Sequence, residues 1–561
     1  MANAFLNKVE NENNLTTTEN GAIAFASTGS ILIDQFGKIS SYLHRDYKLI
    51  FQDQDELWKE NPLNALKFIF YMRMITRKTV ISDKWATTEV QMGQGMKHES
   101  MVRLLWIAKN HWKIFAKNII YLPIVGSWKD LFTLIELDKT YNLTIFSTKK
   151  RRVIYFCIQA GMACPQQFEL IRKFMPRHKH PSKLTTEHTK IMNMIAEELI
   201  MFFGITPKEY NKLKSEGTAH EFQKIICGRK YDQINWNLIP SKALNLLVNS
   251  KFLYNHNLCD NYLEWLDKQP TVKFNGFAYD LLMSLKPYLT WNTIFDPRKK
   301  DDSTFTYRKI LPKHIEHTIN KQFKHLLERA KADRKITENV WCAIDTSGSM
   351  SALVDPKKSN LSVLDIAISL GIFFSSLNEG AFKNHVIMFE SDGRALKLNG
   401  EFSDMVTQFP SNAMGGTNFL SAVEEIVRIR KENPTIPLED YPTTLLVVSD
   451  MQFNPVRRIY LRDSIKEKNN HEAAVDLLKD AFPKEFVEKF KFVWWNVNGI
   501  HNNYPSKIDD GGTYLFSGFD GSVVSLLLGE ETKENSKEKP KNMEDIVKTV
   551  LNQEILTQLT V

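Results

Sequence analysis

The sequence predicts a multidomain protein in which an all-α N-terminal part precedes a doubly wound α/β domain. Three observations support this prediction. The 561 residues exceed what one hydrophobic core usually organises, so two or three domains are expected. Helical periodicity dominates up to about residue 335, whereas short apolar runs alternate with amphipathic helices after it. The net charge changes sign at the same point, from +17 over residues 1–335 to −9 over residues 336–561.

The segment from residue 36 to residue 335 is predicted to form successive amphipathic helices without an intervening sheet. Five stretches place apolar residues at i, i+3, i+4 and i+7, the spacing of one helix face. They are NPLNALKFIFYMRMITRK (61–78), ESMVRLLWIAKNHWKIFAKN (99–118), SWKDLFTLIEL (127–137), TEHTKIMNMIAEELIMFFG (186–204) and PSKALNLLVNSKFLYNH (240–256). Such a succession indicates either a large helical bundle or a curved stack of helical hairpins.

After residue 336 the chain predicts a mostly parallel sheet with helices on both faces. Apolar runs such as NVWCAI, HVIMF and TTLLVVSD alternate with helical segments, which is the rhythm of βαβ units. The predicted organisation is therefore a basic helical domain over 1–335, an α/β domain over 336–528, and a charged linker with a C-terminal helix over 529–561.

The composition favours a soluble, cytoplasmic protein. No apolar run reaches the ~18 residues of a membrane span, and the N-terminus lacks the basic and apolar regions of a signal peptide. The five cysteines have neither CxxC spacing nor histidine partners, so buried, reduced thiols are expected. No membrane partner is predicted.

The apolar run WCAI ends in DTSGSM (345–350), which places oxygen groups at the carboxyl edge of the predicted sheet. The strings GGTNF (415–419) and SDMQF (449–453) reach the same edge, because loops converge there in a doubly wound sheet. Two carboxylates and three hydroxyls suit Mg²⁺ or Mn²⁺ and leave a coordination position open for a carboxylate, a phosphate or water. Gly348 is expected to permit the tight turn that aims both serines inward. The predicted metal ligands are Asp345, Ser347, Ser349, Thr417 and Asp450.

This set, in this order, resembles the metal-ion-dependent adhesion site (MIDAS) of von Willebrand factor A domains, where DxSxS, a later Thr and a later Asp appear on such a sheet. The resemblance implies that Ser347, Ser349 and Thr417 are the more direct ligands. It also implies that Asp345 and Asp450 act partly through water or by orienting the hydroxyls. The alternative interpretation is that Asp345 merely caps a turn while the serines are solvated.

Residues 148–183 contain two basic clusters, KKRR and RKFMPRHKH, together with aromatic side chains. Lys and Arg supply phosphate contacts, and Phe, Tyr and His supply stacking surfaces, as single-stranded nucleic acid requires. A solvated basic face is the competing explanation. The predicted RNA-binding residues are Lys149, Lys150, Arg151, Arg152, Arg172, Lys173, Arg177 and Lys179.

A basic helical part followed by such a domain resembles the Ro autoantigen architecture, a TROVE module of HEAT-like helices closed into a ring by a von Willebrand A domain. The order of five strings carries the resemblance: TENGAIAFASTGSILIDQF, YMRMITRK, LPIVGSWKDL, KFMPR and CGRKYDQINWNLIPSKA. The similarity is closest to Ro-like proteins of bacteria, phages, plants and fungi. It implies binding of single-stranded 3′ ends of structured or misfolded RNA, and of small non-coding RNA on a basic outer face.

The leading functional hypothesis is a monomeric, non-enzymatic, Ro-type RNA-binding protein that docks an acidic protein partner or a phosphate at its Mg²⁺ site. The second hypothesis is a metal-dependent protein interaction scaffold that binds no RNA. A metal-dependent nuclease is disfavoured, because two-metal nucleases need more acidic ligands held about 4 Å apart. No Ser, Cys or His constellation in the sequence has the pattern of an activated nucleophile.

Overall fold

The computed structural model of the chain forms two compact units. The helical unit comprises His44–Ile239 and Lys548–Val561, and the sheet unit comprises Met1–Leu43 and Pro240–Val547. A helical part is thus followed by an α/β part, as the sequence predicts, although residue 335 lies inside the sheet unit. The structure describes residues 14–38, 45–80, 86–216, 221–295, 303–309, 311–334, 338–354, 360–410, 415–456, 468–499, 503–507, 510–518, 540 and 542–561.

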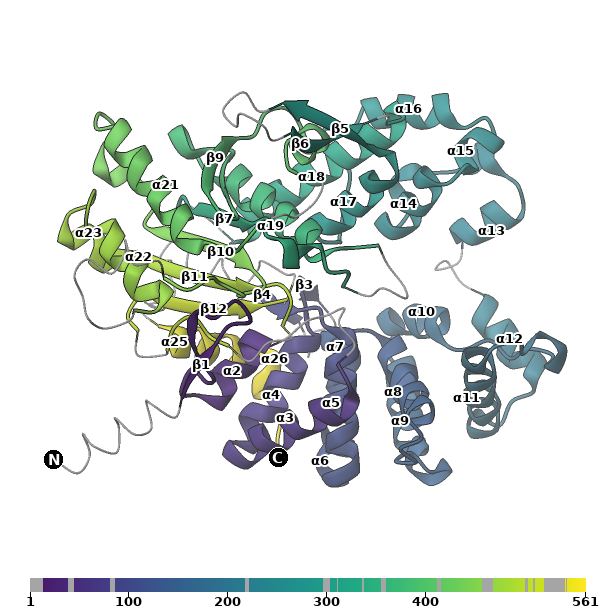
Figure 1. Cartoon of the computed structure of the whole chain (residues 1–561). Coiled ribbons are helices and arrows are strands. Elements are labelled where there is room, and N and C mark those ends of the chain that lie inside the picture. The colour runs from purple at the N-terminus through teal and green to yellow at the C-terminus, as the bar shows by residue number, and fades with distance from the viewer. Residues whose placement is uncertain are drawn as a thin grey trace, which may run out of the picture. The chain divides into compact units, whose positions relative to one another are not determined.

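Short helices joined by tight turns build the helical unit (Figure 1). Their ends follow local signals: α11 starts after Thr186, whose hydroxyl accepts the backbone N–H of Thr189, and stops at Gly204, which has a φ of +65°. The helices are α3 (Tyr47–Glu60), α4 (Pro62–Arg73), α5 (Lys97–Asn110), α6 (Trp112–Asn118), α7 (Leu122–Val125), α8 (Trp128–Thr140), α9 (Thr148–Met162), α10 (Pro165–Phe174), α11 (Glu187–Phe203), α12 (Pro207–Ser215) and α13 (Glu221–Cys227).

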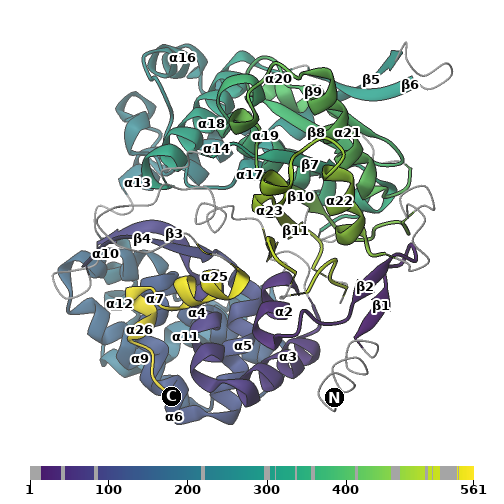
Figure 2. The same cartoon turned by 90° about the vertical axis from the view of Figure 1, so that its left-hand side faces the viewer.

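The end of the chain packs on the helical unit. The predicted C-terminal helix forms as α25 (Met543–Leu551) and α26 (Glu554–Thr557), and α26 lies beside α4 (Figure 2). The amide of Gln553 accepts from the backbone N–H of Met92 at 2.7 Å and donates to its carbonyl at 2.9 Å. The C-terminal residues therefore dock back on their own chain. Most of the predicted linker, residues 529–539 and 541, lies outside the described residues.

The sheet unit is organised by a six-stranded sheet in the order β12-β11-β10-β7-β8-β9. Adjacent strands are parallel except β8 and β9, and the parallel strands are almost wholly buried, in keeping with their continuous apolar sequences. The order along the sheet reverses between β7 and β10, where doubly wound sheets open a crevice at their carboxyl edge. The strands are β7 (Trp341–Asp345), β8 (His385–Phe389), β9 (Gly393–Lys397), β10 (Thr444–Ser449), β11 (Lys491–Asn496) and β12 (Thr513–Ser517).

Helices cover both faces of this sheet. The crossover helix α19 (Val363–Leu377) contacts β7, β8 and β10, and α21 (Phe419–Glu432) contacts β8 and β9. The two crossovers run in opposite directions along the sheet, so right-handed connections place their helices on opposite faces. Every residue of α19 is buried, because further helices pack on its outer side. The remaining helices of the unit are α2 (Ile31–Lys38), α14 (Ser241–Asn249), α15 (Phe252–Asn255), α16 (Cys259–Asp267), α17 (Ala278–Leu285), α18 (Lys313–Arg334), α20 (Phe402–Val406), α22 (Asn470–Leu478) and α23 (Lys484–Lys489).

The predicted domain boundary at residue 335 and the compact units differ because packing crosses that boundary. Helices α17 and α18 contact α19, and Lys286 forms an ion pair with Asp365 at 2.5 Å. At the N-terminus, Phe25 pairs with Tyr504, and α2 contacts β12. Segments that the sequence assigned to the helical domain therefore belong to the core around the sheet.

The prediction of an all-helical N-terminal part is wrong at three places. Two-stranded antiparallel hairpins form there, because β-branched and polar residues alternate around turn residues. They are β1 (Leu15–Thr17) with β2 (Ile23–Phe25), β3 (Ile75–Val80) with β4 (Ala86–Gln94), and β5 (Leu289–Phe295) with β6 (Ser303–Lys309).

The cysteines are free, as expected, but not all are buried. Cys157 and Cys342 are buried, whereas Cys227 is exposed on a short helix that buries no residue. None of the described helices is both long and apolar enough to span a membrane.

Two of the five strings quoted above, YMRMITRK and LPIVGSWKDL, meet in a buried ion pair of the helical unit. Arg73 ends α4 and Asp130 lies in the first turn of α8, and their exposed fractions are 4% and 0%. The Nε and Nη2 atoms of Arg73 lie 2.8 and 2.6 Å from Oδ2 of Asp130. The same oxygen accepts the backbone N–H of Ser127. Gly126 allows this approach, because a Cβ there would lie 2.4 Å from Oδ2.

Asp130→Asn should lower the free energy of unfolding of the helical unit by about 3–5 kcal/mol, because the guanidinium of Arg73 would remain buried without its carboxylate. Urea denaturation measures this change. Asp55→Asn is the matched control, since it breaks the exposed pair of Asp55 with Lys59 and should cost less than about 1 kcal/mol. Equal losses in the two variants would contradict the assignment.

Candidate functional site

The carboxylate of Asp345 lies at the end of β7, beside the point where the strand order reverses. Its side chain is fully buried, with 0% exposed. Oδ1 accepts the backbone N–H of Ser347 at 2.9 Å, and Oδ2 accepts the hydroxyl of Ser449. Asp345 therefore caps the turn, as the alternative interpretation expects, and Oδ1 is the oxygen that makes this contact.

A second buried carboxylate follows the neighbouring strand β10. Asp450 is 1% exposed, and the chain leaves it through Met451, which has a φ of +64°. Burial, and then the negative charge of Asp450, raise the pKa of Asp345 to about 7. The hydrogen bonds that lower this pKa come from Ser347 and Ser449, which are neutral. Two carboxyl groups, which repel each other when both are ionised, are thus buried together at the switch point of the sheet.

The two predicted serines connect this buried pair with solvent. Ser347 is 1% exposed and Ser349 is exposed, and their Oγ atoms lie 3.3 Å apart. The backbone N–H of Gly348 donates to the carbonyl of Gly415 at 3.3 Å, which ties this loop to the loop that carries Thr417. The five predicted ligands therefore lie on three loops at one edge of the sheet.

The loop whose conformation requires glycine is the one that carries Thr417. Gly415 has a φ of +81°, and a Cβ there would lie 2.7 Å from Oε2 of Glu390. The predicted role of Gly348 is wrong, because its φ is outside the left-handed region and a Cβ there would meet only the carbonyl of Gly415 at 3.8 Å. The backbone conformation therefore requires glycine at Gly415 in the GGT string, whereas the sequence predicted this requirement at Gly348 in the DxSxS turn.

Thr417 is buried and is held by neighbours from two other segments. Its carbonyl accepts the backbone N–H of Asn454 at 2.8 Å, and its hydroxyl accepts from the side-chain amide of Asn20 at 3.4 Å. Asn20 also donates to the carbonyl of Gln452, and Gln452 accepts the backbone N–H of Glu19 at 2.8 Å. The turn between β1 and β2 therefore lies against the loops that carry Thr417 and Asp450.

Sequence reasoning missed Asn20, Gln452 and Glu390. Glu390 directly follows β8, so the rule that placed Asp345 at the carboxyl edge would also have placed Glu390 there. Gln452 lies inside the quoted string SDMQF and was overlooked because amides are weaker ligands than carboxylates. No local signal predicts Asn20, because it is separated from Gln452 by 432 positions in the sequence.

The donor set fits a small, hard cation of modest ligand charge. Asp345 and Asp450 provide two carboxylates, and Ser347, Ser349 and Thr417 provide hydroxyl oxygens, which suit Mg²⁺ or Mn²⁺ better than thiolate-loving metals. A cation would also offset the repulsion that raises the pKa of Asp345. Across the described residues no group of three or more His, Cys, Asp or Glu side chains is placed to hold a metal, so any site here depends on the hydroxyls.

Two of the eight predicted RNA-binding residues are committed to the core of the helical unit. Arg151 is 5% exposed, pairs with Glu198 and donates to the carbonyl of Phe146. Arg172 is 7% exposed, pairs with Glu169 at 3.0 Å and donates to the carbonyl of Leu213 at 2.6 Å. Both guanidiniums brace helix packing, so local charge density misassigned them.

The other six remain on or near the surface, in two places. On α9, Lys149 and Arg152 are exposed, and Lys150 lies over the ring of Trp112 with Nζ 4.6 Å from its centroid. Around the end of α10, Arg177 is exposed, and Lys173 and Lys179 are half-buried. The helical unit as a whole contains 32 Lys+Arg and 20 Asp+Glu, a net charge of +12, so the basic excess lies in this unit.

Comparison with known proteins gives matches without an assigned activity. A family model described as a domain of unknown function (DUF2828) matches residues 18–156, and another (DUF7788) matches residues 340–559. A protein of Acanthamoeba polyphaga mimivirus, "Uncharacterized protein L728", is 22% identical over 545 residues, which cover 92% of this chain and 85% of the viral protein. The similarity therefore extends over both the helical and the α/β parts.

Gly415→Ala should lower the free energy of unfolding of the sheet unit by about 1–3 kcal/mol, because the added Cβ meets a left-handed φ and the carboxylate of Glu390. Gly348→Ala is the matched control in the facing loop and should change it by less than about 1 kcal/mol. Thermal or urea unfolding of both variants tests this. A larger loss in Gly348→Ala would restore the role first predicted for that residue.

Proposed function

We propose that this chain is an RNA-binding protein of the Ro type whose von Willebrand A-like sheet unit holds one divalent cation. The observation that carries the proposal is the convergence of two buried carboxylates and three hydroxyls at the reversal of the strand order. The strand order, with a single antiparallel edge strand, and the order DxSxS, Thr, Asp support the von Willebrand A part. The basic, mainly helical unit supports the TROVE-like part.

The proposed cation site uses the exposed edge of the serine turn. Ser347, Ser349 and Thr417 would hold Mg²⁺ or Mn²⁺, with Asp345 and Asp450 orienting hydroxyls or bound water. When bound, the cation supplies positive charge and a coordination position for a partner's carboxylate or phosphate. Because Ser349 is exposed, such a partner can approach from solvent. The proposal is of a binding protein and not of an enzyme, because one cation with two carboxylates lacks the acidic ligands of a two-metal nuclease.

RNA is proposed to bind the basic surface of the helical unit through exposed cations on α9 and at the end of α10. Lys149, Arg152 and Arg177 are exposed, so their charges are available to phosphates. Arg151 and Arg172 are excluded from this proposed surface, since each makes its ion pair inside the unit.

The wild-type protein should bind Mn²⁺, and Ser349→Ala should weaken that affinity at least about 10-fold, because it removes a hydroxyl ligand. Ser351→Ala is the matched control, since Ser349 and Ser351 are both exposed and lie in the same 3₁₀ turn (Gly348–Ser351). Isothermal titration calorimetry with MnCl₂ measures both. Equal affinities for the two variants would contradict the ligand assignment.

The wild-type protein should shift a structured RNA with a single-stranded 3′ tail in a gel-shift assay, with affinity that falls steeply as salt rises. Lys149→Glu combined with Arg152→Glu should weaken binding and reduce the slope of log affinity against log salt by about 1.4, corresponding to two lost single-strand phosphate contacts. The control reverses two exposed lysines on α23, Lys484 and Lys489.

Absence of RNA affinity in the folded wild-type protein at low salt would overturn the RNA proposal. If the protein then captured an acidic protein in Mn²⁺ and released it in EDTA, the function would be that of a metal-dependent interaction scaffold. The capture must survive nuclease treatment for this conclusion, because RNA could otherwise bridge the two proteins.

A further inference from the structure

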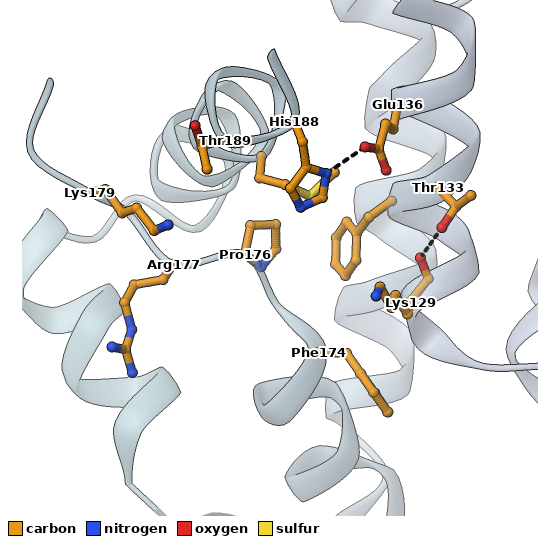
Figure 3. A pocket seen from close by; sticks show the side chains of 11 residues that line it. Lys129, Thr133, Glu136, Phe174, Pro176, Arg177, Lys179, His188 and Thr189 are labelled. Carbon is orange, nitrogen blue, oxygen red and sulfur yellow. Dashed lines mark hydrogen bonds and ion pairs between the residues drawn. The ribbon is translucent and has the colours of Figure 1, made fainter. Parts of the chain in front are cut away.

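A cavity of about 240 Å³ lies in the helical unit between α8, the segment after α10 and the first turn of α11 (Figure 3). We call it the α8–α11 pocket. Its lining includes Lys129, Pro176, Arg177, Lys179 and His188. Pro176, Arg177 and Lys179 belong to the predicted basic cluster RKFMPRHKH, whereas Lys129 comes from the string LPIVGSWKDL. The pocket therefore joins two segments that were considered separately in the sequence.

Cations lie on both sides of the pocket. In Figure 3, Lys129 extends from α8 on one side of Pro176 and His188, and Lys179 and Arg177 lie on the other side. The nearby carboxylate of Glu136 accepts from His188, and Glu197 lies 3.9 Å from His178. Within the described part of the chain none of the three cations forms an ion pair, and in Figure 3 the ammonium of Lys179 points toward Pro176, whereas the guanidinium of Arg177 points away from it.

Part of the pocket lining, which we call its floor, is apolar. Phe132 is 2% exposed, and Pro176 and Met192 complete this surface. The imidazole of His188 is 56% exposed, and its hydrogen bond to Glu136 fixes the orientation of the ring. A held aromatic ring beside an apolar floor is a stacking surface for a planar base.

The segment that carries Arg177 and Lys179 is anchored from beneath. The hydroxyl of Tyr210, a fully buried side chain, donates to the carbonyl of Pro176 at 2.8 Å. The backbone N–H of Lys179 donates to the side chain of Asn193 at 2.8 Å. The pocket is therefore formed in the absence of a ligand, which reduces the entropy lost on binding.

We propose that the α8–α11 pocket binds one nucleotide of single-stranded RNA, with its base against His188 and Pro176 and its flanking phosphates between Lys129 and Lys179. This inference rests on the RNA-binding function proposed above. The volume is below the 300–1,000 Å³ typical of pockets for drug-sized ligands, so the pocket takes a single base, with its phosphates at the mouth, and not a duplex. Three cationic side chains and one carboxylate line the pocket, and that carboxylate also accepts a hydrogen bond from His188. The excess of positive charge favours a phosphate over a cationic ligand.

The test measures the anisotropy of a labelled ten-nucleotide oligouridine on the full chain. Lys129→Glu combined with Lys179→Glu should weaken binding about 10-fold or more and lower the salt slope by about 1.4. The matched control is Lys208→Glu with Lys224→Glu, two exposed lysines of the same unit outside the pocket, which should change affinity less than about 3-fold.

A second pair of variants separates stacking from charge. His188→Ala should weaken oligouridine binding about 5- to 100-fold through the lost base contact while leaving the salt slope unchanged. His180→Ala is its control, because His180 is exposed on the segment that carries Arg177 and Lys179 but does not line the pocket. Both changes are at exposed side chains, and unchanged thermal unfolding verifies that the variants fold.

Two results would overturn the inference, and they are distinguishable. Wild-type affinity retained in both pocket variants would overturn the pocket assignment while leaving the proposed RNA binding intact. No oligouridine or structured-RNA binding by the folded wild-type chain would overturn the proposed function, and the pocket assignment with it.

Discussion

The physical constraint on the carboxyl edge of the sheet unit is the burial of two neighbouring carboxyl groups, those of Asp345 and Asp450. Both lie where the strand order reverses, and burial strengthens the effect of their charges on each other. The surrounding groups reduce this cost through hydrogen bonds from Ser347 and Ser449 to Asp345. A fold optimised for stability alone would place apolar side chains there. Two carboxyl groups retained at this edge are the reason for proposing a cation there.

The two ends of the chain reinforce different units. The N-terminal turn brings Asn20 onto the loops that carry Thr417 and Asp450, and α2 covers the edge strand β12. The C-terminal residues instead bind the helical unit through Gln553 and Thr560. Contacts of this kind close loops of more than 400 residues, so forming them costs more chain entropy than forming the local contacts within a helix or hairpin.

The basic residues of the helical unit have two physical roles that sequence does not separate. Arg73, Arg151 and Arg172 hold buried carboxylates or carbonyls and fix how helices pack. Lys129 and Lys179 lie instead at a pocket mouth, where they contact no carboxylate among the described residues. The residue type alone does not decide the role, because Arg177 also lines the pocket and Lys97 also pairs with the buried Asp130.

The sequence alone determined the helical part, the α/β rhythm, the central strands and the three loops that carry the five predicted ligands. These follow from periodicity and from the rule that loops converge at the carboxyl edge of a parallel sheet. Tertiary structure decided the rest: that Arg151 and Arg172 are buried, that Gly415 and not Gly348 needs glycine, that Asn20 reaches Thr417, and that Lys129 shares a pocket with Lys179. The physical reason is that burial and long-range contacts depend on which surfaces pack together. Local charge and residue spacing do not determine which surfaces these are.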